Sequence, residues 1–307
     1  MKPIYTHTLC ANIITCEMFI GVYIISGMFF SSFHSLGRVV NPRQNTKTYI
    51  YPPFTTNLTG TDITYSGGVY VLSFKDNGNM AFRTDAILPT TVNYLLVGGG
   101  GTGSVGANSG GGGAGGSVIQ IQAGGAGSIS IQDLIKTFTF TVAASVPGPN
   151  TDSQNVAGIT GNPTTAVITG GSTYTAAGGS GGTSAGAGGI GANGGGSGGN
   201  KNGGVGSNGT AVTIRSVEYY FGGGGSGGNT GTGNPKAGLG GGGGSGGGGF
   251  GNNGVIYNRP NGVSQTYGSA GFANSGGGGA GNNGNENNTF SARAGGSGVV
   301  IVWFTYP

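Results

Sequence analysis

The chain has 307 residues, of which 76 are glycine, and only 7% are charged, against roughly 25% in an average soluble domain. Its formal net charge of +4 comes from few residues scattered along the sequence, so no basic patch indicates nucleic-acid binding. Both cysteines and both histidines lie in the first 34 residues, which excludes a disulfide framework, a Cys/His metal site and a Ser-His-Asp triad from the rest of the chain.

Residues 1–34 are predicted to be a signal peptide or a membrane anchor, formed by a hydrophobic helix with its apolar centre at residues 18–30. A spanning helix needs about 20 apolar residues, so membrane association would involve residues 9–33. Three interpretations stay open: a cleaved signal peptide, a retained anchor, and a start that is buried or wrongly assigned.

Residues 35–53 include Pro42, Pro52 and Pro53 and are predicted to be a linker. One domain is expected to follow, over residues 54–307. Its sandwich strands are expected near residues 69–97, 117–143, 165–177, 210–221 and 298–306.

A glycine-rich tract runs from residue 97 to residue 298 and holds nearly all the glycines. Apolar runs border it at residues 92–97 and 299–304, and both are typical of buried strands. A flexible linker does not need such strands, so a packed array of extended chains is favoured. Glycine permits close backbone approach, as at the collagen axis, but the strict Gly-X-Y repeat of collagen is missing and only 11 residues are proline.

An ordered set of features extends through this region. It comprises the β-region at residues 68–74 and 80–84, the strand before the first glycines at 94–98, the glycine block at 110–116, the strand at 137–144, the segments at 165–169 and 174–179, and the closing strand at 295–302. As a set, these features resemble the glycine-rich domains of phage tail-fibre adhesins and of virion proteins of large DNA viruses.

The resemblance covers residues 63–307 and implies an all-β fold: a β-sandwich with a projecting bundle of polyglycine-II segments, preceded in this chain by the N-terminal hydrophobic helix. It also implies that loops connecting the bundle segments bind a receptor. The chain departs from the family's pattern at residues 119–135, which are longer and less rich in glycine.

A literal dinucleotide-binding pattern, Gly98-x-Gly100-x-x-Gly103, follows the first apolar run. That motif requires a helix directly after it and an acidic residue about 20 positions later. The sequence offers neither, because more glycine follows and the region around residues 120–122 has no carboxylate. We therefore expect no cofactor, no metal site and no enzymatic activity.

Aromatic residues interrupt the glycine blocks, and Tyr and Arg are the residue types that dominate binding hot spots. Alternatively, some of them pack on the glycine array or on the sandwich. Because polyglycine-II chains pack closely only where side chains are absent, large side chains should lie at turns or in the outer layer, where the turns of one bundle end would present them together. The predicted receptor-binding residues are Tyr219, Tyr220, Tyr257, Arg259, Tyr267 and Phe272. The sequons predict N-glycosylation at Asn57, Asn208 and Asn287 in a secretory lumen.

These observations predict a non-enzymatic viral surface or adhesin-like protein, located on the virion surface or secreted or membrane-associated. Its expected partner is a host-surface glycan or protein receptor and not nucleic acid. Assembly into a homo-oligomer is a further open alternative. The alternative is a structural glycine-rich matrix or wall protein without a specific receptor. Saturable binding to glycans or cells discriminates between the two.

Overall fold

The computed structural model describes residues 52–59, 62–106, 110–125, 127–151, 155–191, 204–228, 269–282 and 290–306. All of them belong to one compact unit, residues 51–307. No α-helix occurs in these ranges, and η2 (Ile131–Ile135) is a short 3-10 helix. The helix predicted within residues 1–34 lies outside the described residues.

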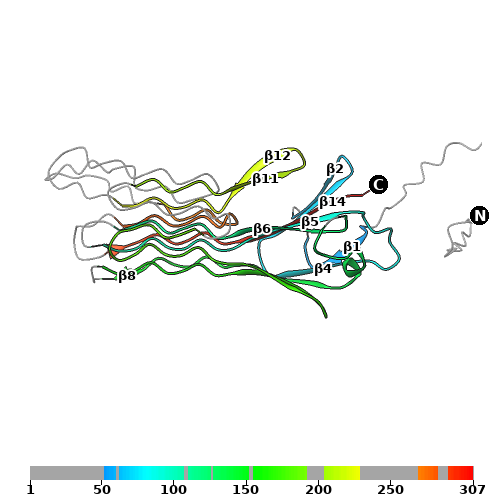
Figure 1. The fold of residues 1–307 in the computed structure, drawn as a ribbon, viewed down its shortest axis with the longest axis horizontal. Helices are drawn as coiled ribbons and strands as arrows, with labels where there is room; N and C mark the ends of the chain where they lie inside the picture. The colour runs from blue at the N-terminus through cyan, green and yellow to red at the C-terminus, as the bar shows by residue number, and fades with distance from the viewer. Residues whose placement is uncertain are drawn as a thin grey trace, which may run out of the picture. The chain divides into compact units, whose positions relative to one another are not determined.

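Two five-stranded antiparallel sheets form the wide end of this unit (Figure 1). Sheet one contains, in spatial order, β1 (Phe54–Thr56), β4 (Gly78–Phe82), β7 (Phe138–Thr141), β9 (Thr164–Ile168) and β10 (Thr173–Ala176). Sheet two contains β2 (Ile63–Ser66), β3 (Val69–Phe74), β14 (Val299–Thr305), β5 (Val92–Val97) and β6 (Val118–Ala123). The two apolar runs that border the glycine tract are β5 and β14, and they pair directly, with Val97 opposite Val299.

A hydrophobic core fills the space between the two sheets, as expected for a β-sandwich. Alternate side chains of β3 point inward, so that Leu72 and Phe74 are fully buried. The ring of Phe74 lies 4.6 Å from that of Phe140 in sheet one, measured between centroids. Tyr94 of sheet two stacks on Phe138 at 5.0 Å, with an interplanar angle of 11°. The all-β sandwich architecture predicted from the sequence is therefore confirmed.

The outer face of sheet two is covered by a separate hairpin of β11 (Thr210–Ile214) and β12 (Val217–Phe221). Val212, Ile214 and Phe221 of the hairpin form a second buried cluster with residues of β5 and β14. This second cluster explains why four consecutive residues at the start of β14 are buried, in contrast to the alternation of β3. Residues 210–221 were expected among the sandwich strands, but they pair only with each other in the described structure.

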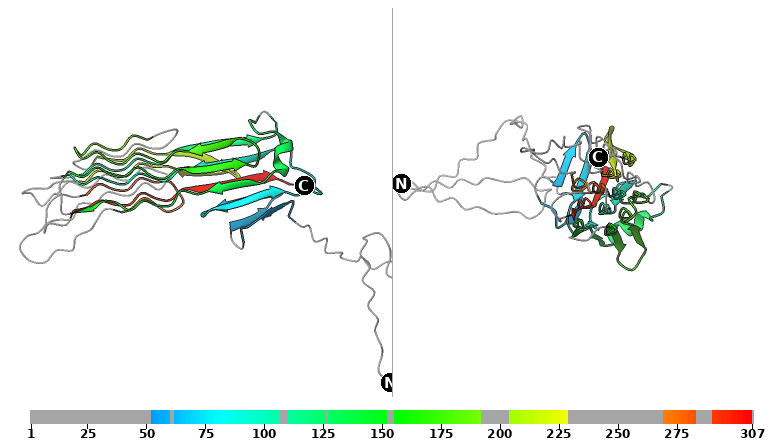
Figure 2. Two further views of the ribbon diagram at one scale, coloured as in Figure 1. Left: turned by 90° about the horizontal axis from the view of Figure 1, so that it is seen from below. Right: turned by 90° about the vertical axis from the view of Figure 1, so that its left-hand side faces the viewer.

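A bundle of extended glycine-rich segments continues from the strands at one end of the sandwich (Figures 1 and 2). We call it the glycine bundle. Its described segments are residues 98–106, 110–117, 142–149, 155–163, 177–191, 204–209, 222–228, 269–282 and 292–298. Two short strands, β8 (Asn150–Thr151) and β13 (Phe290–Ser291), pair with each other at its far end.

Main-chain hydrogen bonds between the segments hold the glycine bundle together, and along segment 98–106 they repeat every three residues. Donor–acceptor distances along this segment are 2.8–3.1 Å. The N–H groups of Gly98, Gly101 and Ser104 donate to segment 110–117, those of Gly99, Thr102 and Val105 to segment 155–163, and those of Gly100 and Gly103 to segment 292–298. A strand alternates with period two, so the change to period three at Gly98 marks where the sandwich ends and the bundle begins.

Close approach of backbones explains why the bundle interior is glycine. A Cβ atom added to Gly113 would collide with the carbonyl group of Gly101 on the neighbouring segment. The segments 98–106, 110–117 and 222–228 are buried throughout their described length. Segment 177–191 lies in the outer layer, and from Ala176, the last residue of β10, every third residue is buried as far as Gly182.

Candidate functional site

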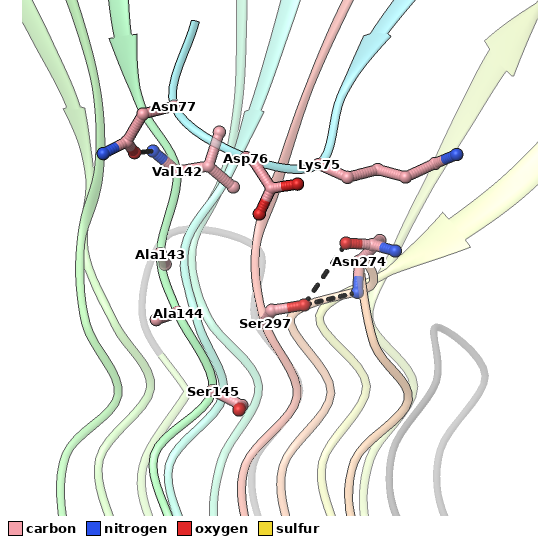
Figure 3. A pocket seen from close by; sticks show the side chains of 9 residues that line it. All are labelled: Lys75, Asp76, Asn77, Val142, Ala143, Ala144, Ser145, Asn274 and Ser297. Carbon is pink, nitrogen blue, oxygen red and sulfur yellow. Dashed lines mark hydrogen bonds between the residues drawn. The ribbon is translucent and has the colours of Figure 1, made fainter. Parts of the chain in front are cut away.

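A pocket lies where the sandwich meets the glycine bundle, and its volume is about 760 Å³ (Figure 3). Four stretches that are far apart in the sequence supply its walls. They are the turn between β3 and β4, the start of the bundle segment after β7, segment 269–282, and the end of segment 292–298 just before β14. The lining residues are Lys75, Asp76, Asn77, Val142, Ala143, Ala144, Ser145, Asn274 and Ser297.

Hydrogen bonds fix two sides of this pocket. The side-chain oxygen of Asn77 accepts from the main-chain N–H of Val142 at 2.8 Å. On the opposite side, Ser297 Oγ accepts from the N–H of Asn274 at 2.8 Å and donates to its side-chain oxygen at 3.3 Å. Asn274 has a φ of 59°, a left-handed conformation that Asn tolerates better than most residues. These bonds therefore hold a tight turn with its amide group at the pocket wall.

Two charged side chains line the pocket, Lys75 and Asp76. Lys75 Nζ lies 2.7 Å from Asp62 Oδ1 in an ion pair that is partly exposed. Asp76 is the only carboxylate among the lining residues, and Figure 3 shows it on the same side as Asn274 and Ser297. The side chains of Asp76, Asn274 and Ser297 can hold hydroxyl or amide groups by hydrogen bonds.

The predicted receptor-binding residues Tyr219 and Tyr220 lie on β12 of the hairpin, and both are exposed. The hairpin is tied to sheet two at its turn, where the guanidinium of Arg215 donates to Thr64 Oγ1 and to the carbonyl oxygen of Ser66, both at 3.3 Å. A hydrogen bond to Glu218 raises the pKa of the Tyr220 phenol above its ordinary value. The two tyrosines are thus held on a fixed support beside the sandwich.

Phe272 is exposed on segment 269–282, close to the same end of the bundle. Its carbonyl oxygen accepts from Ser275 Oγ at 2.7 Å. The N–H of Gly222, directly after β12, donates to the carbonyl oxygen of Ser275 at 2.7 Å. The structure therefore places Phe272, Tyr219 and Tyr220 at the sandwich end of the bundle, on neighbouring segments.

The remaining predicted receptor-binding residues, Tyr257, Arg259 and Tyr267, lie outside the described residues, as does the sequon residue Asn287. Residues 257, 259 and 267 belong to the stretch between Gly228 and Ser269. Gly228 is at the far end of the bundle, because its N–H donates to the carbonyl of Gly110, whose own N–H donates to the carbonyl of Asn282. The stretch thus leaves the described structure at the end opposite to Tyr219 and Phe272.

Two sequon residues are described. Asn57 lies beside the turn before β4, where its side-chain oxygen accepts from the N–H of Asn79 at 2.9 Å and its amide donates to the carbonyl of Asn77 at 3.4 Å. Asn208 is exposed in the bundle segment that leads into β11. The Asn57 amide is thus engaged in the fold, and Asn208 is exposed.

The pocket residues were not among the sequence predictions. The signal that could have indicated one wall is the Asp76-Asn77-Gly78 run, because Asn and Gly favour turns. Nothing in the sequence relates that turn to Asn274 or Ser297, since the contact depends on how the bundle segments are ordered in space.

Within the described ranges, no group of three or more His, Cys, Asp or Glu side chains is arranged to hold a metal ion. In the same part of the chain, no helix has the length and apolar character needed to cross a membrane. A scan of protein-family models and a search of curated protein sequences find no match to the chain.

Proposed function

We propose that this protein is a non-enzymatic, adhesin-like surface protein, in which the glycine bundle is a rigid scaffold for receptor-binding loops. The observation that carries the proposal is the period-three hydrogen bonding along segment 98–106, which reaches three different neighbours. Three residues per turn is the repeat of polyproline-II-type helices, and we assign the bundle segments to polyglycine II. The sequence resemblance to viral and phage adhesin domains supports the same function and suggests a virion surface.

The far end of the bundle is suited to present loops. Described segments end there as hydrogen-bonded neighbours, including Gly110, Gly228 and Asn282, and β8 and β13 pair beside them. The stretches 107–109, 152–154, 229–268 and 283–289 each join two of these ends. Loops anchored on a rigid base lose little conformational entropy on binding, which favours specific recognition of a host glycan or protein.

Receptor binding is tested with the full chain on a glycan array and on host cells. We expect saturable binding that the double substitution Tyr257→Ala and Arg259→Ala weakens by about 1 kcal/mol or more per hot-spot residue, with the melting temperature unchanged. The control is Tyr65→Ala, which removes an exposed aromatic ring from the sandwich end and should leave binding intact.

The alternative function, a matrix or wall protein without a receptor, predicts no saturable binding in either assay. If the double variant instead melts at a clearly lower temperature, Tyr257 and Arg259 are packing residues and the assignment of the receptor site is wrong. Detection of the protein in purified virions tests the proposed location separately.

A further inference from the structure

The outer strand of the β11–β12 hairpin carries an uncovered apolar surface. Residues opposite each other on paired strands point to the same face, so Tyr219 and Val217 share a face with their partners Val212 and Ile214. Val212 and Ile214 are buried against sheet two, whereas Tyr219 and Val217 are 46% and 51% exposed. The hairpin therefore covers sheet two with β11 and with Phe221 at the end of β12, whereas Val217 and Tyr219 of β12 extend beyond that contact.

The turn of the hairpin determines which main-chain groups of β12 face outward. Arg215 and Ser216 have φ angles of 52° and 63°, as in the two-residue type I′ turn, which is closed by a hydrogen-bonded pair. That pair is Ile214 and Val217. The N–H and C=O groups of Val217, Tyr219 and Phe221 consequently point to β11, and those of the alternate residues point away from it.

An independent contact agrees with this alternation. Gly222, the next residue of the outward set, donates its N–H to Ser275 rather than to β11. The outward main-chain groups of Glu218 and Tyr220 have no strand beside them among the described residues, because β12 pairs with β11 alone there. Figure 1 shows β12 as the outermost described strand on that side of the unit.

We propose that β12 is a self-association edge, at which a second copy of this chain adds its own β12 in antiparallel orientation. The two copies are centred on Tyr219, so that Glu218 of each pairs with Tyr220 of the other. This register uses every outward N–H and C=O group of those two residues. It is separate from the loop residues Tyr257 and Arg259 tested under the proposed function, but it uses Tyr219 and Tyr220, which are also among the predicted receptor-binding residues.

The side chains suit this register. Tyr219 lies opposite its own copy, and Val217 lies opposite Phe221, which extends the apolar face across both hairpins. Glu218 lies opposite Tyr220, the same pair that interacts within one chain, so the two carboxylates are not directly opposed. Lys, Pro and bulges, by which soluble proteins protect an exposed edge, are absent from β12, and its one charged residue is Glu218.

The register is tested by disulfide trapping in the full chain with Cys10→Ser and Cys16→Ser. Directly opposed residues of a non-hydrogen-bonded antiparallel pair have Cα atoms about 4.5 Å apart, within the range that a disulfide spans. Under mild oxidation, Tyr219→Cys should form a covalent dimer. Val217→Cys should not, because in this register it faces Phe221 and not itself.

Equal crosslinking of the two cysteine variants would indicate random collision, and crosslinking of Val217→Cys alone would indicate another register; either result overturns the proposal. Association through residues 1–50 would affect both variants equally and cannot produce the expected difference.

A second variant tests the hydrogen bonds themselves. Tyr220→Pro removes an outward N–H that β11 does not use, so it should leave the hairpin intact and abolish the dimer seen by analytical ultracentrifugation across the micromolar range. Tyr220→Thr retains the N–H and should still dimerise. A monomeric parent chain, or a Tyr220→Pro variant that melts normally and still dimerises, overturns the proposal.

Discussion

Strands of the sandwich continue directly into segments of the glycine bundle, yet different interactions stabilise the two regions. In the sandwich, large rings such as Phe74 and Phe140 fill the space between sheets. In the bundle, the carbonyl of Gly101 occupies the place that a Cβ on Gly113 would need. The comparison shows that one chain can exclude water either with side chains or with backbone alone, and that glycine is required only in the second case.

The largest expected effect is loss of a ring from the sandwich core. Phe138 is fully buried and stacks on Tyr94, so Phe138→Ala should lower the free energy of unfolding by about 3–5 kcal/mol. Urea denaturation measures this, with Phe138→Leu as the milder control. A loss below about 1 kcal/mol would mean that the bundle, and not the side-chain core, dominates stability.

The bundle should be sensitive to a much smaller change. Gly113 donates to the carbonyl of Gly279 and accepts from the N–H of Gly225, both at 2.8 Å, so the methyl group in Gly113→Ala must displace bonded backbone. We expect a loss of about 1–3 kcal/mol in the same denaturation experiment.

Gly99→Ala is the matched control for this substitution. A Cβ there would meet its nearest atoms, on Ala143 and Asn162, at 3.2 Å, so small shifts can accommodate it and the loss should stay below about 1 kcal/mol. Equal losses for the two alanine variants would contradict the close backbone packing of the bundle.

The smallest expected effect has the opposite sign. The hydroxyl of Tyr94 is buried and finds no hydrogen-bond partner among the described residues, so Tyr94→Phe should stabilise the protein by about 1 kcal/mol. Tyr65→Phe, at an exposed ring, should be neutral. Destabilisation by Tyr94→Phe would show that the hydroxyl has a partner after all.

Because of Tyr94, we also expect the stability of the protein to depend on pH. Burial raises the pKa of the Tyr94 phenol above its ordinary value of 10.0. The unfolded chain then loses the Tyr94 proton at a lower pH than the folded chain. The free energy of unfolding therefore keeps its full value with respect to this group below pH 10 and falls as the pH rises above 10. Unfolding curves recorded between neutral and alkaline pH should show the decline in the parent and a smaller one in Tyr94→Phe.

Much of the sandwich could be predicted from the sequence. The apolar runs at β5 and β14 identified buried strands, because only a strand covered on both faces is apolar at consecutive positions. Glycine blocks between such strands indicated packed extended chains. The prediction of strand structure over residues 117–143 was too coarse. In the structure, β6 belongs to sheet two and β7 to sheet one, and η2 lies between them in the sequence.

The candidate binding residues were less predictable. Residue type selected Tyr219, Tyr220 and Phe272, and all three are exposed. Their position at the sandwich end of the bundle follows from the hairpin that carries β12 and from the turn in segment 269–282. The pocket with Asp76, Asn274 and Ser297 was missed, because its walls come from turns that only the order of the bundle segments brings together.

By itself, the sequence determined that the chain alternates between apolar strands and glycine segments, since residue pattern and the absence of side chains act locally. The tertiary structure decided the rest. Which segment receives each N–H, which face of sheet two the hairpin covers, and which edge of β12 pairs with β11 all depend on how segments meet in space. A hydrogen-bonding backbone is the same at every residue, so no local pattern of amino acids could specify those partners.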